Sequence, residues 1–279
     1  MGSSTRCVFY QRVISYMISN EQKMVFVSPK AQWLSKQDQD KVSQAVELLK
    51  EVYGEDVFAN DNLISMGRHI GFMKDIDFHR AYTKECHTPH SRSLVWRLHV
   101  LGNACLNALA LDGDFVECGV FKGLKSAFLC EMMQFQQYKN HKEFYLYDTF
   151  DGIPEKYAHD SPIEPTTHQR PGLLNDVLNR FERYPNVHIV QGIVPDCLAN
   201  RSPSKVAYLH LDMNSAIAES GALAYFWCKL TPGAWIVLDD YGWKAFGKQK
   251  EAADKFFADK GYHVTELPTG QGLVVVRAD

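Results

Sequence analysis

The stretch DFVECGVFKG, residues 114–123, indicates the fold more strongly than any other part of the chain. Its apolar first half predicts a short strand over Phe115–Cys118. The glycines that follow, Gly119 and Gly123, predict a tight turn, and the apolar residues of Leu124–Phe135 predict a helix. A strand, a glycine-containing turn and a helix in this order are typical of the first unit of a nucleotide-binding α/β sheet.

The turn has the spacing E-x-G-x-x-x-G, which differs from the G-x-G-x-x-G of a dinucleotide-binding turn. A dinucleotide site offers backbone amides to a pyrophosphate, and the carboxylate of Glu117 would repel that group. It would instead attract a cationic amino group, such as that of the methionyl part of S-adenosylmethionine. Ser126, on the first turn of the following helix, would hydrogen-bond the ligand's carboxylate. The alternative interpretation is an ordinary tight turn.

Beyond this stretch the chain alternates short apolar strands with helices. The further predicted strands are 144–147, 187–190, 206–211 and 234–238, and the helices between them are 171–184, 219–230 and 249–260. Two last β runs, 262–267 and 272–276, are separated only by Pro268–Gln271, a link short enough to join antiparallel neighbours. We therefore predict an α/β fold: a Rossmann-like, mostly parallel sheet of order 3-2-1-4-5 with a C-terminal antiparallel hairpin, which is typical of class I methyltransferases.

The region before this sheet is harder to interpret. Residues 1–93 predict an N-terminal helical cap or oligomerisation region, and residues 94–279 an S-adenosylmethionine-binding domain. Within the cap, Val8–Ile18 predicts a helix or strand that packs on a partner subunit. A helix over Asp38–Tyr53 has Ser35 as its cap, and Leu63–Tyr82 predicts loop and short helix. The cap forms either the acceptor pocket or the interface of a homodimer or higher homo-oligomer.

Composition excludes several classes of protein. Apolar residues make up 46% of the chain, charged residues 23%, and the formal net charge is −3, so a basic nucleic-acid-binding surface is not expected. The sequence contains no apolar run near the roughly 18 residues that a membrane span needs and no signal-peptide pattern. The seven cysteines are scattered without a CxxC pair, which favours reduced thiols and a cytoplasmic protein without membrane or nucleic-acid partners.

The next two predicted strands end in residues suited to the rest of the cofactor. Asp148 can accept hydrogen bonds from both ribose hydroxyls, or it can cap a loop. Gly192 would let an adenine ring approach the backbone, and Ile193 would cover a face of that ring. Phe121 is a candidate to face the sulfonium, because aromatic faces attract cations, although such aromatic residues are more often core.

The other half of the predicted sheet ends in acids. Asp212 follows the fourth strand, and Asp239 and Asp240 follow the fifth. Strands one and four are neighbours in the predicted order, so Glu117, Asp212 and Asp239 should line one rim of the crevice. Such acids can hold a hard divalent cation, or one of them can act as general base. Solvated or capped strand ends are the alternative.

Three motifs together resemble the macrocin O-methyltransferase family. They are DFVECGV with Gly123, residues 147–154 (YDTFDGIP) and residues 238–242 (LDDYG). The resemblance covers about residues 95–279. It implies S-adenosylmethionine as methyl donor, a small-molecule acceptor with a sugar-like hydroxyl, and a Mg²⁺ ion held by Asp212, Asp239 and Asp240. The chain departs from the family's L-D-x-D-x-Y-x-S after the fourth strand, where Asn214 replaces the second acid and the tyrosine is absent.

The sequence thus predicts an O-methyltransferase with named roles. Asp212 and Asp239 are the predicted catalytic residues. The predicted cofactor-binding residues are Glu117, Gly119, Phe121, Gly123, Ser126, Asp148, Thr149, Gly192, Ile193 and Asp212. Two other classes remain open: a nicotinamide-dependent oxidoreductase on the same type of sheet, and a non-catalytic scaffold that keeps the fold and binds a partner. Glu117 and the terminal hairpin speak against the first, and the acids at the strand ends against the second.

Overall fold

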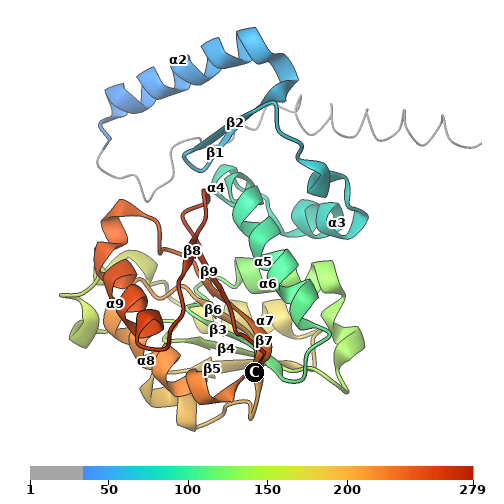
Figure 1. The fold of residues 1–279 in the computed structure, drawn as a ribbon, viewed down its shortest axis with the longest axis vertical. Helices are drawn as coiled ribbons and strands as arrows, with labels where there is room; N and C mark the ends of the chain where they lie inside the picture. The colour runs from blue at the N-terminus through green and yellow to red at the C-terminus, as the bar shows by residue number, and fades with distance from the viewer. Residues whose placement is uncertain (1–33, 279) are drawn as a thin grey trace, which may run out of the picture. The chain divides into compact units, whose positions relative to one another are not determined.

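The computed structural model describes residues 34–278, so the predicted segment Val8–Ile18 lies outside the described residues. The chain divides into two compact units, with the boundary between Val95 and Trp96 (Figure 1). No helix within residues 34–278 is long and apolar enough to cross a membrane. The six cysteines in this range are all free thiols.

The described part of the first unit, from residue 34 on, contains helices and a strand pair. Its elements, with 3₁₀ helices labelled η, are α2 (Lys36–Tyr53), η2 (Gly54–Asp56), β1 (Val57–Asn60), β2 (Leu63–Met66), η3 (Gly71–Lys74), α3 (Ile76–Glu85) and α4 (Pro89–Ser93). As predicted, Ser35 caps α2, and its side chain accepts a hydrogen bond from the amide of Asp38. The antiparallel pair β1–β2 was not predicted. It forms because Asp61 and Asn62 adopt positive φ angles of 50° and 61°, which a two-residue hairpin turn requires and which Asp and Asn tolerate.

The second unit is built on a seven-stranded sheet. The strands are β3 (Asp114–Cys118), β4 (Phe144–Asp148), β5 (Val187–Gln191), β6 (Val206–Leu211), β7 (Leu230–Leu238), β8 (Thr265–Glu266) and β9 (Gly272–Val275). Their order in the sheet is β5-β4-β3-β6-β7-β9-β8. The pairs from β5 to β7 are parallel, and β9 pairs antiparallel with both β7 and β8. This order confirms the predicted fold class, terminal hairpin included.

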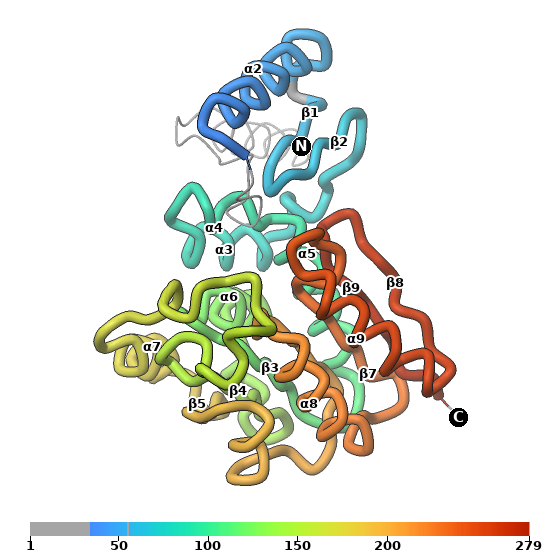
Figure 2. The backbone as a smooth tube through the Cα atoms, turned by 90° about the vertical axis from the view of Figure 1, so that its left-hand side faces the viewer, coloured from blue at the N-terminus to red at the C-terminus, as the bar shows by residue number. Residues whose placement is uncertain are grey.

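Helices cover both faces of this sheet. The helices are α5 (Val95–Ala108), α6 (Leu124–Met133), α7 (Leu173–Phe181), α8 (Ala216–Phe226) and α9 (Gly247–Ala258), with short 3₁₀ turns between elements. In both views α8 and α9 lie side by side on one face, and α5, α6 and α7 cover the other (Figures 1 and 2). Since the sheet is covered on both sides, its central strand β6 is buried at every position. That explains why β6 is a continuous, mostly apolar run.

The strand register places the candidate site. Cys118 is the partner of Leu211, and Leu211 is the partner of Leu238, so β3, β6 and β7 end level with one another. The ladder continues one residue further, because the Asp212 amide donates to Cys118 (2.9 Å) and the Asp239 amide to Leu211 (2.9 Å). Side chains just beyond these strand ends therefore meet at one edge of the sheet, as expected for open α/β sheets.

Candidate functional site

Three carboxylates from two adjacent strand ends form the centre of this edge. Asp212 follows β6, and Asp239 and Asp240 follow β7; each offers a carboxylate oxygen within 4.8 Å of those of the other two. Asp239 and Asp240 are almost fully buried, whereas the Asp212 side chain keeps 19% exposure. The acid cluster predicted from the sequence therefore forms, and Asp212 is its most accessible member.

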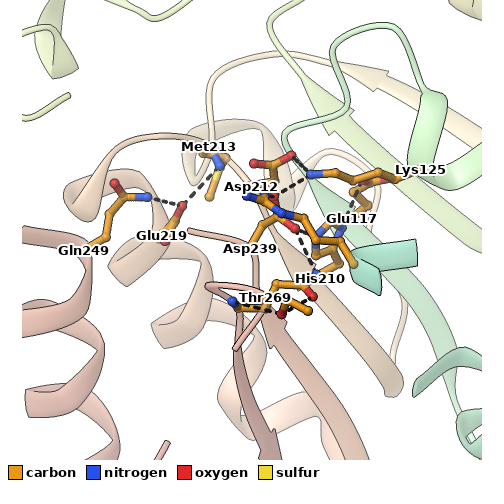
Figure 3. Close-up of polar contacts among 11 residues, drawn as sticks. Glu117, Lys125, His210, Asp212, Met213, Glu219, Asp239, Gln249 and Thr269 are labelled. Atoms are coloured by element: carbon orange, nitrogen blue, oxygen red, sulfur yellow. Dashed lines mark hydrogen bonds and ion pairs between the residues drawn. The ribbon is translucent and has the colours of Figure 1, made fainter. Parts of the chain in front are cut away.

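The ammonium of Lys125 lies between two of these carboxylates (Figure 3). Lys125 projects from the first turn of α6, and its Nζ is 2.5 Å from Asp212 Oδ2 and 2.6 Å from Asp239 Oδ2. Burial lowers the pKa of Lys125, but the charges of Asp212 and Asp239 outweigh that effect and raise the pKa above its usual value. Lys125 is therefore charged at physiological pH and neutralises part of the acid cluster.

Asp239 has two further partners. The guanidinium of Arg97, on α5, donates from Nη1 to Asp239 Oδ2 over 2.8 Å, and the Arg97 side chain is only 2% exposed. Gln271, in the link between β8 and β9, donates from Nε2 to Asp239 Oδ1 over 3.1 Å. Both oxygens of Asp239 thus accept hydrogen bonds. A buried carboxylate is stable only when it is paired in this way.

Glu117 joins the cluster through a histidine. Its Oε1 is 3.0 Å from Nδ1 of His210, and Nε2 of that ring is 3.6 Å from Asp239 Oδ1. Burial lowers the pKa of His210, but the nearby carboxylates of Asp239 and Glu117 more than compensate and raise it to about 9. Burial also raises the pKa of Glu117. His210, which looks like an isolated core histidine in the sequence, thus connects Glu117 at the end of β3 to the acid cluster.

The loop that carries Asp212 is held by α8 and α9. Glu219 Oε1, on α8, accepts from the Met213 amide (3.2 Å) and from Gln249 Nε2 of α9 (2.8 Å) (Figure 3). Asn214, which follows Met213, has a positive φ of 56°, a conformation that Asn adopts more readily than most residues. The family that the sequence resembles has an acid at this position. In this chain the positive φ of Asn214 gives the residue a role in shaping the backbone after β6.

The carboxylate of Asp148 orders the turn after β3. Its Oδ2 accepts from the amides of Val120 (2.7 Å) and Phe121 (2.8 Å), and its Oδ1 accepts from the amide of Phe150 (2.7 Å). A carboxylate has about four lone-pair sites, so about one remains for a ligand hydroxyl. Thr149 Oγ1 also lies 3.4 Å from Asp148 Oδ1, but its single proton is donated over the shorter distance of 2.6 Å to the Gly152 carbonyl. Asp148 therefore holds the turn after β3 in place and is also a candidate ligand contact.

The predicted glycines make room for the protein's own atoms. A Cβ on Gly119, where φ is +92°, would lie 2.1 Å from the Asp212 carbonyl oxygen, and one on Gly192 would lie 2.4 Å from Cys197 Cβ. A Cβ on Gly123 would lie 2.7 Å from the Phe181 ring. These glycines are needed for chain packing before any ligand is considered. Ile193 packs on the small apolar cluster of Ile153, Tyr157 and Ala218.

Phe121 and Ser126 lie on the same turn and helix start. Phe121 has a positive φ of 49°, and its ring centroid is 4.7 Å from that of His168. Ser126 is fully buried, and neither its Oγ nor Oε2 of Glu117 has a hydrogen-bond partner among residues 34–278. Buried polar atoms are rarely left without a partner. These two atoms are therefore free to bind a polar ligand.

Sequence analysis missed Lys125, Arg97 and Gln271. For two of them a signal was present, because Lys125 and Arg97 are single cations in helices that are otherwise apolar on most faces. A buried cation needs a buried acid, and the predicted strand ends offered several. Gln271 lies in a short link and gave no such signal.

Comparisons with known proteins agree with this geometry. Residues 94–266, more than half of the chain, match the family described as Macrocin-O-methyltransferase (TylF). The chain is 27% identical over 150 residues to the 8-demethyl-8-(2,3-dimethoxy-alpha-L-rhamnosyl)-tetracenomycin-C 4'-O-methyltransferase of Streptomyces olivaceus, covering 49% of this chain and 57% of that protein. It is 26% identical over 159 residues to the mycinamicin III 3''-O-methyltransferase of Micromonospora griseorubida, covering 52% and 62%. The chain thus matches only about three fifths of the length of these relatives.

Solved structures support the same fold. The O-methyltransferase NovP superposes with a TM-score of 0.58 at 18% identity, over 85% of this chain and 99% of that one. The calicheamicin methyltransferase CalS11 superposes with a TM-score of 0.58 at 14% identity, over 87% and 93%. The matched segment contains the E-x-G-x-x-x-G turn, the strand-end acids and Lys125. The chain belongs to the macrocin O-methyltransferase family.

Proposed function

We propose that the chain is an S-adenosylmethionine-dependent O-methyltransferase that acts on a hydroxyl of a sugar or another small natural-product-like acceptor. One observation carries this proposal: two buried polar atoms on either side of the turn after β3, Glu117 Oε2 at the end of β3 and Ser126 Oγ at the start of α6, have no partner among the described residues. An unpaired carboxylate oxygen suits a ligand ammonium, and a nearby hydroxyl suits a ligand carboxylate. The methionyl part of the cofactor has both groups.

The other predicted residues would complete the cofactor site. When bound, S-adenosylmethionine supplies an electrophilic methyl group on a sulfonium. Asp148 keeps the turn in place through the amides of Val120 and Phe121, and its remaining acceptor capacity suits a ribose hydroxyl. The face of Phe121 is polarised to attract a cation. Gly192 and Ile193 follow β5, on the side of the sheet where the adenine would lie.

Asp212 is the residue best placed to act on the acceptor. Its side chain is 19% exposed, whereas that of Asp239 is not exposed at all, so only the first can be reached by an acceptor without rearrangement. As general base, the Asp212 carboxylate would take the hydroxyl proton as the acceptor oxygen is methylated, and the methyl group would leave its sulfur so that S-adenosylhomocysteine is released. Asp239 holds the cations around Asp212 in place and is a positioning residue. The main contribution of the enzyme would be to hold the methyl donor and the acceptor hydroxyl close together in the orientation that transfer requires.

The proposed acceptor class rests on the family. The names of both relatives specify O-methylation at a numbered position of a small molecule, and the first of them names a rhamnosyl group. These names support a sugar-like hydroxyl as the acceptor group.

Calorimetric titration with S-adenosylhomocysteine, and in parallel with NADH, tests the cofactor assignment. We expect micromolar binding of S-adenosylhomocysteine alone, weakened at least tenfold by Glu117→Gln. Lys122→Ala, an exposed change on the same turn, is the matched control. Transfer of a labelled methyl group to a panel of nucleotide-linked and glycoside-linked deoxysugars then tests the reaction. Failure to bind S-adenosylhomocysteine would refute the proposal, and binding without transfer to any acceptor would favour the non-catalytic scaffold.

A further inference from the structure

The position that the family resemblance assigns to Mg²⁺ contains a cation that belongs to the chain. Lys125 Nζ is 2.5 Å from Asp212 Oδ2 and 2.6 Å from Asp239 Oδ2, and both residues are members of the acid cluster. A magnesium ion lies 2.0–2.1 Å from its ligand oxygens and demands octahedral geometry. The ammonium therefore pairs with two of the three carboxylates on which such an ion would depend.

Asp239 has little capacity left for a metal. Its Oδ2 already accepts from Lys125 and Arg97, and its Oδ1 accepts from Gln271. The side chains of Lys125 and Arg97 are 13% and 2% exposed, so water screens their charges weakly. A divalent ion at Asp239 would lie beside two buried cations. The residues present do not fit a divalent metal while Lys125 stays in place.

We propose that Lys125 replaces the divalent metal, so that methyl transfer by this chain requires no metal ion. The proposal rests on the proposed function. Lys125 is a positioning residue: its ammonium joins Asp212 to Asp239, fixes the Asp212 carboxylate at the exposed rim, and supplies the positive charge beside the acceptor oxygen. The acids keep the arrangement of a metal site, so removing the ammonium should turn Asp212, Asp239 and Asp240 into one.

Manganese binding to the purified protein tests this without any methyl acceptor. Mn²⁺ prefers oxygen ligands, and its free form is counted directly by electron paramagnetic resonance. We expect the wild-type protein to leave Mn²⁺ free up to 1 mM or so, by analogy with weak carboxylate sites at roughly 10⁻³ M. Lys125→Ala should bind one equivalent at least tenfold more tightly. Lys125→Ala with Asp212→Asn should lose that gain, and Lys122→Ala should match the wild type.

Two further measurements test the proposal even if Lys125→Ala folds poorly. Lys125→Gln fills the same volume without charge and offers an amide oxygen as ligand, so it should also gain Mn²⁺ binding. In the wild-type protein, methyl transfer should be unchanged by excess EDTA and by added Mg²⁺. Tight Mn²⁺ binding to the wild type, no gain in either Lys125 variant, or loss of activity in EDTA would each overturn the proposal. Binding of S-adenosylhomocysteine is measured separately, so a failure of the proposed function is recognised as such.

Discussion

Arg97→Met removes a buried charge and leaves the aliphatic packing of the side chain largely intact. The Arg97 side chain is 2% exposed, its guanidinium is 2.8 Å from a carboxylate of Asp239 that is not exposed, and it also lies 4.9 Å from the ring centroid of Trp243. Breaking a buried ion pair on one side typically costs about 3–5 kcal/mol. Lys125 still pairs with Asp239, so we expect the low end, about 3 kcal/mol. For a protein of this size that corresponds to a fall in Tm of about 6–12 °C.

Urea unfolding of the wild type, Arg97→Met, Asp239→Asn and the double variant measures this cost and its origin. The double variant should be less destabilised than the sum of the single variants by about 1–3 kcal/mol, because the two residues contact each other. Lys205→Met breaks the exposed pair with Asp112, whose side chains are 60% and 75% exposed, and should unfold like the wild type. An Arg97→Met protein within about 1 kcal/mol of the wild type, or additive single variants, would refute the assignment of a buried pair.

The remaining predictions concern the turn, the glycines and the loop after β4. Asp148→Asn should weaken S-adenosylhomocysteine binding at least tenfold by calorimetry and cost about 1–3 kcal/mol of stability. The NH2 group of the introduced amide must face either the Phe150 amide or the two amides of Val120 and Phe121, which then lose their acceptor. Unchanged affinity would contradict this role. Gly119→Ala should prevent soluble expression or lower Tm strongly, since its Cβ would lie 2.1 Å from the Asp212 carbonyl oxygen, whereas Gly247→Ala, with nothing within 4 Å, should be tolerated. Asp160→Ala should speed proteolysis within residues 151–171 without unfolding the sheet. The reason is that the Asp160 carboxylate accepts from Ser215 Oγ (2.9 Å) and from the Ile217 amide (2.8 Å) at the start of α8. An unchanged cleavage rate would mean that this contact does not hold the loop.

The sheet could be predicted because strands and helices differ in the spacing of their apolar residues and in the residues that end them. β6 is a run of buried residues, and the link from β8 to β9 is too short for a helix, so the parallel part and the antiparallel hairpin follow from local patterns. The acids after β6 and β7 could be predicted for the same reason, since parallel strands end at one edge.

The pairing within the site could not be predicted in the same way. Asp239 is bound by Arg97 and Lys125, which lie 142 and 114 residues away in the sequence. No periodicity connects helices α5 and α6 to the end of β7, and the family resemblance directed attention to a metal ion in place of a lysine. The sequence predicts close ligand approach at Gly119 and Gly192, and the structure adds a reason for these glycines that the sequence does not contain, since atoms of Asp212 and Cys197 lie against them.

The strand pair β1–β2 had a local signal that the sequence analysis did not use. Asp61 and Asn62 stand between two short apolar runs, and Asp and Asn tolerate the positive φ that a two-residue hairpin turn needs.

The long sequence separations within the acid cluster also bear on how the chain folds. Closing Arg97 onto Asp239, Lys125 onto Asp212 and Glu117 onto His210 joins segments 142, 87 and 93 residues apart. Contacts of this kind form late, because the chain entropy of closing the loop is lost before the contact stabilises anything. Each buried charge also needs its partner when water leaves, so the pairs should form together in the last cooperative step. Competence to bind the cofactor should then appear only with the slowest refolding phase, which makes the site a reporter of complete folding of the second unit.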